Sequence, residues 1–258
     1  MCIREIKIMD KVKAGELIYG RNPIVEAIKD GKEFEKIYIQ DSMRGETEKE
    51  IRALCKEYNI PLSRVPTEKL NYLSRNQNHQ GLIGSISPII YQNLDLILAH
   101  VYEQGRNPLI VVLEGVSDVR NLGAIARSAL LFGADALVFT AKNNASINAD
   151  TIKSSAGAIL QIPVCREKNM MTIIDLIQSY GVKILATDLH GASYIGEVNL
   201  TEPIAIIMGA EEKGVTLETL RRSDHRIMIP QQTDFDSLNV SVAAGVILYE
   251  TLRQRKLH

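Results

Sequence analysis

Hydrophobic and polar positions alternate differently before residue 88 and after residue 106. In the first part, the segment KIYIQ has the β-branched and aromatic residues of a strand. The segment ETEKEIRALCKEYN instead places apolar residues at i, i+3 and i+4, which predicts a helix over 46–59. Short strands are expected at 36–40, 60–65 and 80–87. Residues 17–87 are therefore predicted to form a small mixed α/β domain that follows a tail at 1–16.

A connecting segment is predicted at 88–106. Pro88 ends the last strand of the first domain. The apolar residues of 93–105 have helical spacing, and Gly105 provides a stop signal for that helix.

From residue 107 to residue 258 the pattern becomes a repeated strand, loop and helix. The expected strands are short aliphatic runs at 109–113, 136–139, 182–186, 203–208 and 225–229. Helices are expected at 121–132, 171–180 and 237–253. Aliphatic runs without alternation are typical of strands buried on both faces of a parallel sheet. The second domain is thus predicted to be α/β with a mostly parallel sheet. The stripe Leu238, Val242, Val246 and Tyr249 is expected along one side of the last helix.

Ligands of open α/β sheets gather beyond the carboxyl ends of the strands. In this chain the candidate positions are Glu114-Gly115, Thr140, Thr187-Asp188, Gly209-Ala210-Glu211 and Pro230-Gln231.

Composition and charge narrow the class of protein. The chain has 258 residues, 45% hydrophobic and 24% charged, with a net charge of −1. Binding of nucleic acid would therefore depend on local patches and shape and not on an overall basic field. No apolar run approaches the roughly 20 residues that cross a bilayer, so no membrane association is expected. The N-terminus lacks a signal core, and the dispersed Cys2, Cys55 and Cys165 fit a reducing cytoplasm.

Several common site motifs are absent from the sequence. GxGxxG after a strand, GxxxxGK[ST] and HExxH do not occur, and His and Cys are not clustered. A Rossmann dinucleotide site, a P-loop and a dedicated metal site are therefore not expected.

Three segments carry the functional signal. In EGVSDVRNLGAIARSALLFG, a helix is expected to start near Asn121, with Gly123 and Arg127 four residues apart. Gly123 costs a helix about 1 kcal/mol relative to alanine, which predicts a close approach by something at that point. IIMGAEEKGV is a strand followed by a glycine-bounded loop, and glycines let backbone amides come near a ligand. IPQQTDFDSLNVSVAAGVILY has Asp236 or Ser237 as candidate caps of a helix rich in small residues.

Taken together, these segments resemble the SpoU-type branch of the SPOUT RNA methyltransferases. NxGxxxR matches Asn121, Gly123 and Arg127, and GxExxG matches Gly209, Glu211 and Gly214. IP…SLNVSVAxG matches Ile229, Pro230 and the run from Ser237 to Gly245. YGRNPIVEAI and HQGLIGSI resemble the substrate-binding domain fused to the 23S ribosomal RNA guanosine 2′-O-methyltransferases, whose fold is L30e-like. The resemblance covers residues 17–255.

The resemblance implies a C-terminal domain with an α/β-knot, which binds S-adenosylmethionine and transfers its methyl group to a ribose 2′-hydroxyl. It implies cofactor-binding residues Thr187, Met208, Gly209, Ile229, Pro230 and Leu238. It implies catalytic residues Arg127, Asn121, Glu211, Ser237 and Asn239. Because a guanidinium stays protonated, Arg127 is expected to fix a phosphate and stabilise oxyanion charge. A general-base role for Arg127 is a minority interpretation, and Glu211 is expected either to orient Arg127 or to bind the nucleotide.

The resemblance also implies partners. A homodimer through the knot region and last helix is expected, with 23S ribosomal RNA as the substrate. The expected RNA contacts are Arg21, Asn22, Arg75, Asn76, His79 and Gln80.

The sequence departs from the family pattern at three positions. Gln231 stands where methionine is usual, Thr233 where glycine is usual, and Glu114 where aspartate is common. QTDFDSLN is also similar to antibiotic-resistance methyltransferases of the family, which modify another nucleotide. Transfer RNA and an adenosine of the thiostrepton region thus remain alternative targets. A non-catalytic RNA-binding assembly factor is the alternative from another class, although Arg127, Glu211 and Asn239 are all present.

Overall fold

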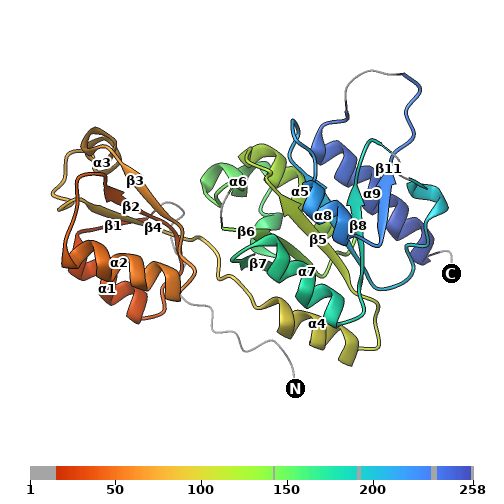
Figure 1. Ribbon diagram of the computed structural model, residues 1–258, viewed down its shortest axis with the longest axis horizontal. Helices are drawn as coiled ribbons and strands as arrows, with labels where there is room; N and C mark the ends of the chain where they lie inside the picture. The colour runs from red at the N-terminus through yellow and green to blue at the C-terminus, as the bar shows by residue number, and fades with distance from the viewer. Residues whose placement is uncertain (1–15, 142, 191–192, 234–236, 257–258) are drawn as a thin grey trace. The chain divides into compact units, whose positions relative to one another are not determined.

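A computed structural model describes residues 16–141, 143–190, 193–233 and 237–256. The chain divides into two compact units, which are described separately. One unit holds the residues up to Ile90 together with Ile147–Ala149, and the other holds the remainder (Figure 1).

The N-terminal unit is a mixed sheet with helices. Its elements are β1 (Leu17–Tyr19), α1 (Arg21–Lys29), β2 (Phe34–Gln40), α2 (Glu46–Glu57), β3 (Leu62–Val65), α3 (Thr67–Ser74) and β4 (Leu82–Ile86). The strand order is β1-β4-β2-β3, in which β4 is antiparallel to both neighbours and β2 and β3 are parallel. Ile24 and Ile28 of α1 and Ile51 of α2 join one core with the strands. The predicted strands and helix of this domain are present, whereas β1, α1 and α3 were not predicted.

The C-terminal unit is a parallel sheet. Its strands are β5 (Leu109–Glu114), β6 (Ala136–Thr140), β7 (Val164–Glu167), β8 (Lys183–Thr187), β9 (Ser193–Tyr194), β10 (Ile204–Gly209) and β11 (His225–Met228). The order is β7-β6-β5-β10-β8-β11-β9, and each neighbouring pair is parallel. The five predicted strands are present, with β7 and β9 in addition.

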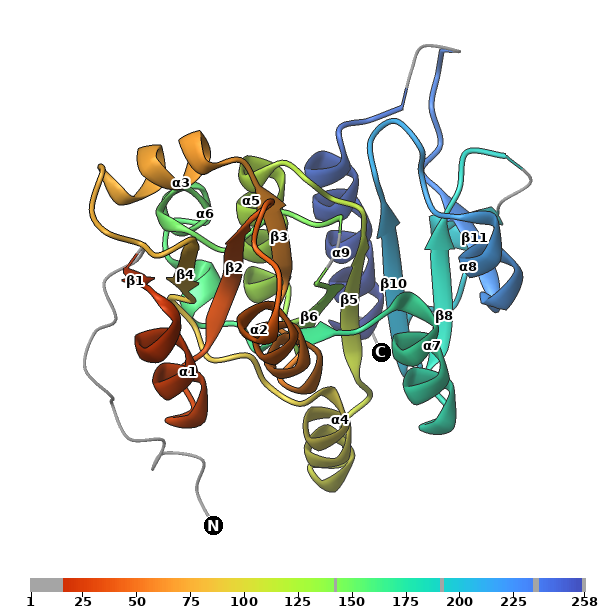
Figure 2. The ribbon, with the colours of Figure 1, turned by 60° about the vertical axis from the view of Figure 1, so that its left-hand side comes forward.

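Helices cover both faces of this sheet. They are α4 (Leu94–Glu103), α5 (Val119–Leu131), α6 (Ala149–Ser154), α7 (Met170–Ser179), α8 (Leu217–Arg222) and α9 (Val240–Lys256), with 3₁₀ turns at Ala158–Leu160 and Ile195–Glu197. In Figure 2, α4 and α7 lie on one side of the strands and α5 and α9 on the other. Every residue of β10 is buried, because hydrophobic side chains on both faces meet a helix layer.

The last helix corrects two expectations. It begins at Val240, so Asn239 precedes it and caps it: Asn239 Oδ1 accepts hydrogen bonds from the N–H groups of Ser241 (2.9 Å) and Val242 (3.4 Å). The expected cap Ser237 is therefore wrong, and Asp236 lies outside the described residues. The side of α9 that packs in the unit consists of Val240, Ala244, Ile247, Leu248 and Thr251. The apolar stripe noted in the sequence is instead exposed at Leu238, Val242, Val246 and Tyr249.

Candidate active site

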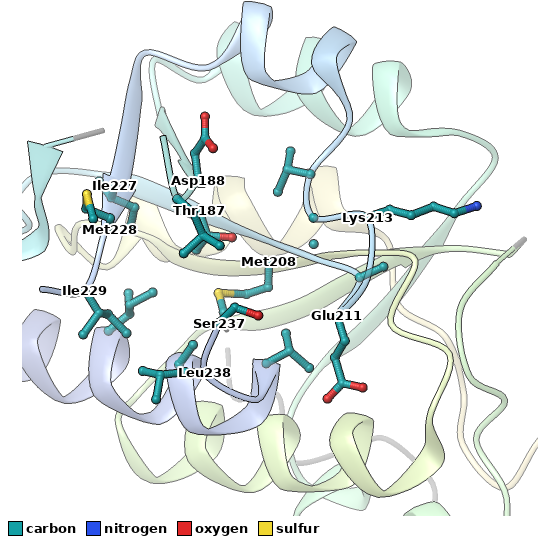
Figure 3. Close-up of a pocket in the computed structure, with 18 of the residues that line it drawn as sticks. Thr187, Asp188, Met208, Glu211, Lys213, Ile227, Met228, Ile229, Ser237 and Leu238 are labelled. Atoms are coloured by element: carbon teal, nitrogen blue, oxygen red, sulfur yellow. The ribbon is translucent and has the colours of Figure 1, made fainter. Parts of the chain in front are cut away.

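A cavity of about 330 Å³ opens at the carboxyl ends of the adjacent strands β8, β10 and β11. Its walls are the segments that follow these strands and the start of α9. The lining residues are Thr187–His190, Met208–Val215, Ile227–Ile229, Gln231, Ser237, Leu238, Val240, Ala243 and Ile247. In Figure 3, Met208, Ser237 and Leu238 project into the same space, whereas the Lys213 side chain extends away from them.

The cavity has both apolar and charged walls. Met208, Ile229 and Leu238 supply apolar surface. Asp188 supplies a carboxylate that accepts a hydrogen bond from the His190 N–H (3.1 Å) and lies 3.6 Å from Arg226. Such a site can hold a molecule that combines an apolar ring with charged groups.

The loop after β10 is compact because its glycines allow backbone to touch backbone. A Cβ at Gly209 would lie 2.1 Å from the carbonyl carbon of Gly214 and 2.3 Å from the nitrogen of Val215. The Gly214 N–H also donates to the Ala210 carbonyl (2.8 Å), and Gly214 has a φ of +63°. Gly209 therefore brings the main chain, and not a side chain, to the wall of the cavity.

Glu114, at the end of β5, holds the far end of this loop. Its carboxylate accepts hydrogen bonds from the N–H (3.1 Å) and Oγ1 (2.9 Å) of Thr216 and from Oγ1 of Thr219 (3.1 Å). Glu114 was a candidate site position in the sequence, but it does not line the cavity. Glu114 instead has a structural role, because its hydrogen bonds hold the start of α8 in place.

Three side chains from distant parts of the chain meet beside the cavity. The Nδ2 atoms of Asn121 and Asn239 both donate to Oε1 of Glu211, at 2.9 and 2.5 Å, and Asn239 Nδ2 also lies 3.1 Å from Asn121 Oδ1. We call these residues the Asn–Glu–Asn network. It joins the start of α5, the β10 loop and the cap of α9. Of the two expected roles of Glu211, orientation of Arg127 has no hydrogen bond or ion pair to support it among the described residues.

The start of α5 is fixed by two further side chains. Asp118 caps the helix by accepting from the N–H groups of Arg120 (2.7 Å) and Asn121 (3.2 Å), and these bonds hold its pKa below the ordinary value. The helix therefore begins at Val119, two residues before the expected start. Asn144 Oδ1 accepts from the N–H groups of Gly115 and Val116, both at 3.0 Å, and so holds the preceding loop. Sequence reasoning missed Asn144, and no motif marked it.

Another segment of the chain packs closely against Gly123, as the glycine in a helix predicted. A Cβ there would lie 2.0 Å from Oγ of Ser154 and 2.8 Å from the nitrogen of Ser155. The neighbour is thus the C-terminal end of α6, and not a ligand.

Arg127 lies apart from the cavity on the exposed side of α5. It follows Asn121 by six residues, or roughly 9 Å along the helix axis. No hydrogen bond or ion pair within the described part of the chain occupies its guanidinium. An anion from outside the subunit can therefore reach it.

The other residues that the resemblance implied divide into those that line the cavity and one that does not. Thr187, Met208, Gly209, Ile229 and Leu238 line the cavity, together with Glu211 and Ser237. Pro230 does not line it. Sequence reasoning did not select the cavity residues Asp188, His190 and Lys213 as cofactor ligands, although Asp188 was marked as a strand end.

The expected RNA contacts lie on the N-terminal unit and differ in availability. Asn22, Arg75, Asn76 and Gln80 are exposed, and Arg21 is held by Glu50 (2.7 Å). His79 is buried: its Nδ1 accepts from the Gly81 N–H (3.0 Å), so its Nε2 is the donor to Asn71 Oδ1 (2.9 Å). Both ring nitrogens are thereby used within the fold.

Two kinds of feature are absent from the described residues. No helix in that part of the chain is long and apolar enough to span a bilayer. No group of three or more His, Cys, Asp and Glu side chains there is arranged to hold a metal ion.

Comparisons with known proteins give the class of protein that has this parallel sheet, backbone-walled cavity and Asn–Glu–Asn network. The SpoU rRNA Methylase family matches residues 108–249, and the family described as RNA 2′-O ribose methyltransferase substrate binding matches residues 17–92. A Mycobacterium sp. protein named as an uncharacterized tRNA/rRNA methyltransferase is 33% identical over 247 residues, which are 95% of this chain and 79% of that protein.

Solved structures show the same fold. The SpoU methyltransferase AviRb from Streptomyces viridochromogenes, in complex with AdoMet, has a TM-score of 0.61 at 21% identity, covering 95% of this chain and 92% of that one. A structure described as an RNA 2′-O ribose methyltransferase has a TM-score of 0.56 at 29% identity, covering 95% and 90%. The predicted fold class is confirmed for the α/β domain with its mostly parallel sheet and for the small N-terminal α/β domain. The chain belongs to the SpoU rRNA methylase family.

Proposed function

We propose that this enzyme methylates the 2′-hydroxyl of a ribose in ribosomal RNA, with a 23S guanosine as the target. The observation that carries the proposal is the Asn–Glu–Asn network beside a backbone-walled cavity. The substrate-binding family match at residues 17–92 supports a ribose 2′-hydroxyl as the acceptor. The free, buried thiols of Cys55 and Cys165 are in keeping with a cytoplasmic enzyme.

The cavity fits S-adenosylmethionine through its chemistry. The main chain at Gly209 and the side chains of Met208, Ile229 and Leu238 would hold the adenosyl group, because no side chain intrudes at Gly209. S-adenosylmethionine supplies an electrophilic methyl group. Thr187 holds the end of β8 by donating from Oγ1 to the Ile207 carbonyl (3.2 Å).

In the proposed reaction the Asn–Glu–Asn network and Arg127 would have different roles. Glu211 is a positioning residue that aligns α5 with the cap of α9. Arg127, exposed on α5, binds a phosphate next to the reacting ribose and stabilises negative charge on its oxygen.

The test of the reaction uses tritiated S-adenosylmethionine with separate samples of undermethylated 23S RNA, 16S RNA and tRNA. Label in an alkali-resistant dinucleotide of 23S RNA is expected. Label only in tRNA would overturn the substrate but keep the chemistry. Absence of both label and cofactor binding would favour the non-catalytic assembly factor.

Arg127→Ala tests the division of roles. Turnover should be abolished while the affinity for S-adenosylmethionine stays within a few-fold of wild type. Loss of cofactor binding in this variant would move Arg127 into the cofactor site and contradict the assignment.

We also propose that the enzyme is a homodimer through α5 and α9. Leu131, Val242, Val246 and Tyr249 form an exposed apolar surface, the α5–α9 patch, in which Tyr249 is 57% exposed and Leu131 69%. Phe132 joins the two helices by an edge contact to Tyr249, with ring centroids 6.2 Å apart. Apolar surface of this kind is typical of an interface between subunits.

Light scattering after gel filtration tests the dimer. Val246→Asp should convert the wild-type dimer into a folded monomer, because it places a charge in the α5–α9 patch. Leu217→Asp is the matched control, since Leu217 is 71% exposed on α8 and should leave the dimer intact. A monomeric wild type would refute the proposal.

A further inference from the structure

Tyr72 is a large aromatic residue that the N-terminal unit leaves in solvent. It lies on α3 and is 79% exposed, the highest value of any large hydrophobic residue in the described ranges. The opposite side of α3 is anchored, because Leu70 and Ser74 are buried. The ring therefore projects from a fixed helix, and no packing within the unit explains an aromatic residue there.

The surroundings of the ring are cationic. The Lys69 ammonium lies over one face of the Tyr72 ring, 6.0 Å from its centre, and the exposed Arg75 follows at the end of the helix. Glu68 is the carboxylate on this helix, so the two cations outnumber it. A ring face with cations beside it complements a base joined to phosphates.

The loop that follows α3 is held in one conformation. Arg75, Asn76 and Gln80 all have positive φ, at 53°, 61° and 50°. Non-glycine residues in this region cost energy and persist where the surroundings hold them. His79 does so by bonding both Asn71 on α3 and the Gly81 N–H. The backbone that carries the exposed polar side chains of this loop is thereby held next to the Tyr72 helix.

From these contacts we infer that the Tyr72 ring is a stacking platform for an unpaired base of the RNA substrate, with Lys69 and Arg75 neutralising the neighbouring phosphates. This inference rests on the proposed function and narrows its substrate to RNA with an accessible single-stranded loop or bulge. Bases within an A-form helix are stacked on each other, so paired RNA would not offer a face to the ring.

The absence of tryptophan from the sequence allows a direct test. Tyr72→Trp in the full-length protein places the chain's single tryptophan at the platform, where its fluorescence reports on the ring. A hairpin RNA with an unpaired loop should quench it saturably, whereas a fully paired duplex and heparin should not. Tyr58→Trp is the matched control, because Tyr58 is 47% exposed at the end of α2 in the same unit and should not respond to the hairpin. Equal quenching in both variants, or none at Tyr72→Trp, would overturn the inference.

Methyl transfer provides a second readout. Tyr72→Ala should raise KM for RNA about tenfold while kcat and the affinity for S-adenosylmethionine stay unchanged. Tyr72→Phe should behave as wild type, because stacking needs the ring and not the hydroxyl. Lys69→Gln should weaken binding to all RNAs and lower the slope of the salt dependence by about one.

The two proposals fail in different ways. If the wild type methylates RNA and Tyr72→Ala has an unchanged KM, only the stacking platform is wrong. If the wild type neither binds S-adenosylmethionine nor methylates RNA, the proposed function is wrong, whatever the quenching shows.

Discussion

Gly209→Ala tests whether the cofactor site depends on contact between two stretches of main chain. The added Cβ would lie 2.1 Å from the Gly214 carbonyl carbon, while ordinary contact begins at 3.4 Å. The loop would have to move by the difference, about 1.3 Å. Its far end cannot follow freely, because Thr216 is bonded to Glu114.

The expected magnitude follows from this geometry. Overpacking of this kind costs about 1–3 kcal/mol of stability, which lowers Tm by roughly 2–4 °C for each kcal/mol in a chain of this size. Displacement of the loop also moves its backbone groups away from the cofactor. Loss of about two net hydrogen bonds, near 2 kcal/mol, corresponds to about thirtyfold weaker binding of S-adenosylmethionine.

Calorimetric titration with S-adenosylmethionine measures the affinity, and a thermal melt confirms that the variant is folded. Gly245→Ala is the matched control, because its Cβ would lie 3.8 Å from Ser128 Oγ, an ordinary contact. That control should bind the cofactor as wild type does and gain roughly 0.5–1 kcal/mol from replacement of a helical glycine. A folded Gly209→Ala that binds within threefold of wild type would refute the reasoning.

Three further changes test other parts of the C-terminal unit. Arg255→Lys should lower the free energy of unfolding in urea by roughly 2–4 kcal/mol. The Arg255 guanidinium donates to four backbone carbonyls, and an ammonium group cannot donate in the same planar arrangement. An unchanged urea midpoint would contradict this prediction. Glu250 has its pKa lowered from 4.5 to about 2, first by a hydrogen bond from Arg253, so the stability it provides is complete above pH 4.5 and is lost as the pH falls toward 2. The Tm difference between wild type and Glu250→Gln should therefore narrow over that range in calorimetry, and a constant difference would count against the ion pair. Glu114→Gln should cost about 1–2 kcal/mol in urea unfolding, because one amide oxygen replaces two carboxylate oxygens that hold Thr216; wild-type stability would show that the loop is held otherwise.

The sequence was sufficient for five of the seven strands described in the C-terminal unit, because burial on both faces makes strands such as β5 and β10 continuous aliphatic runs. It missed β7 and β9, which have only four and two residues. It was less informative for α3, whose eight residues contain a single buried hydrophobic side chain, Leu70. Helical spacing cannot be recognised from one position.

The last helix shows a second limit of the pattern. Val242, Val246 and Tyr249 have helical spacing, but so do Val240, Ala244 and Ile247 on the buried side. Periodicity shows that a face is apolar and does not show what covers it. To tell the core face from the exposed face, the position of α9 against α5 was required.

For the site, the sequence marked Asn121, Glu211 and Asn239 through separate motifs but could not show that they touch. The three pairs are separated by 90, 118 and 28 residues, and no local pattern carries that information. No sequence motif marks Asn144, because its role is to accept hydrogen bonds from the backbone N–H groups of Gly115 and Val116.

The β10 loop explains why the network and the cavity occur together. Gly209 places main chain at the cavity, and two residues later Glu211 accepts the amides of Asn121 and Asn239. One short segment therefore sets both the shape of the cavity and the alignment of the helices that approach it. Because Arg127 is carried by the same helix as Asn121, its position relative to the cavity depends on this carboxylate even though the two side chains do not bond to each other within the described residues. Glu211 can thus be required for methyl transfer without removing a proton.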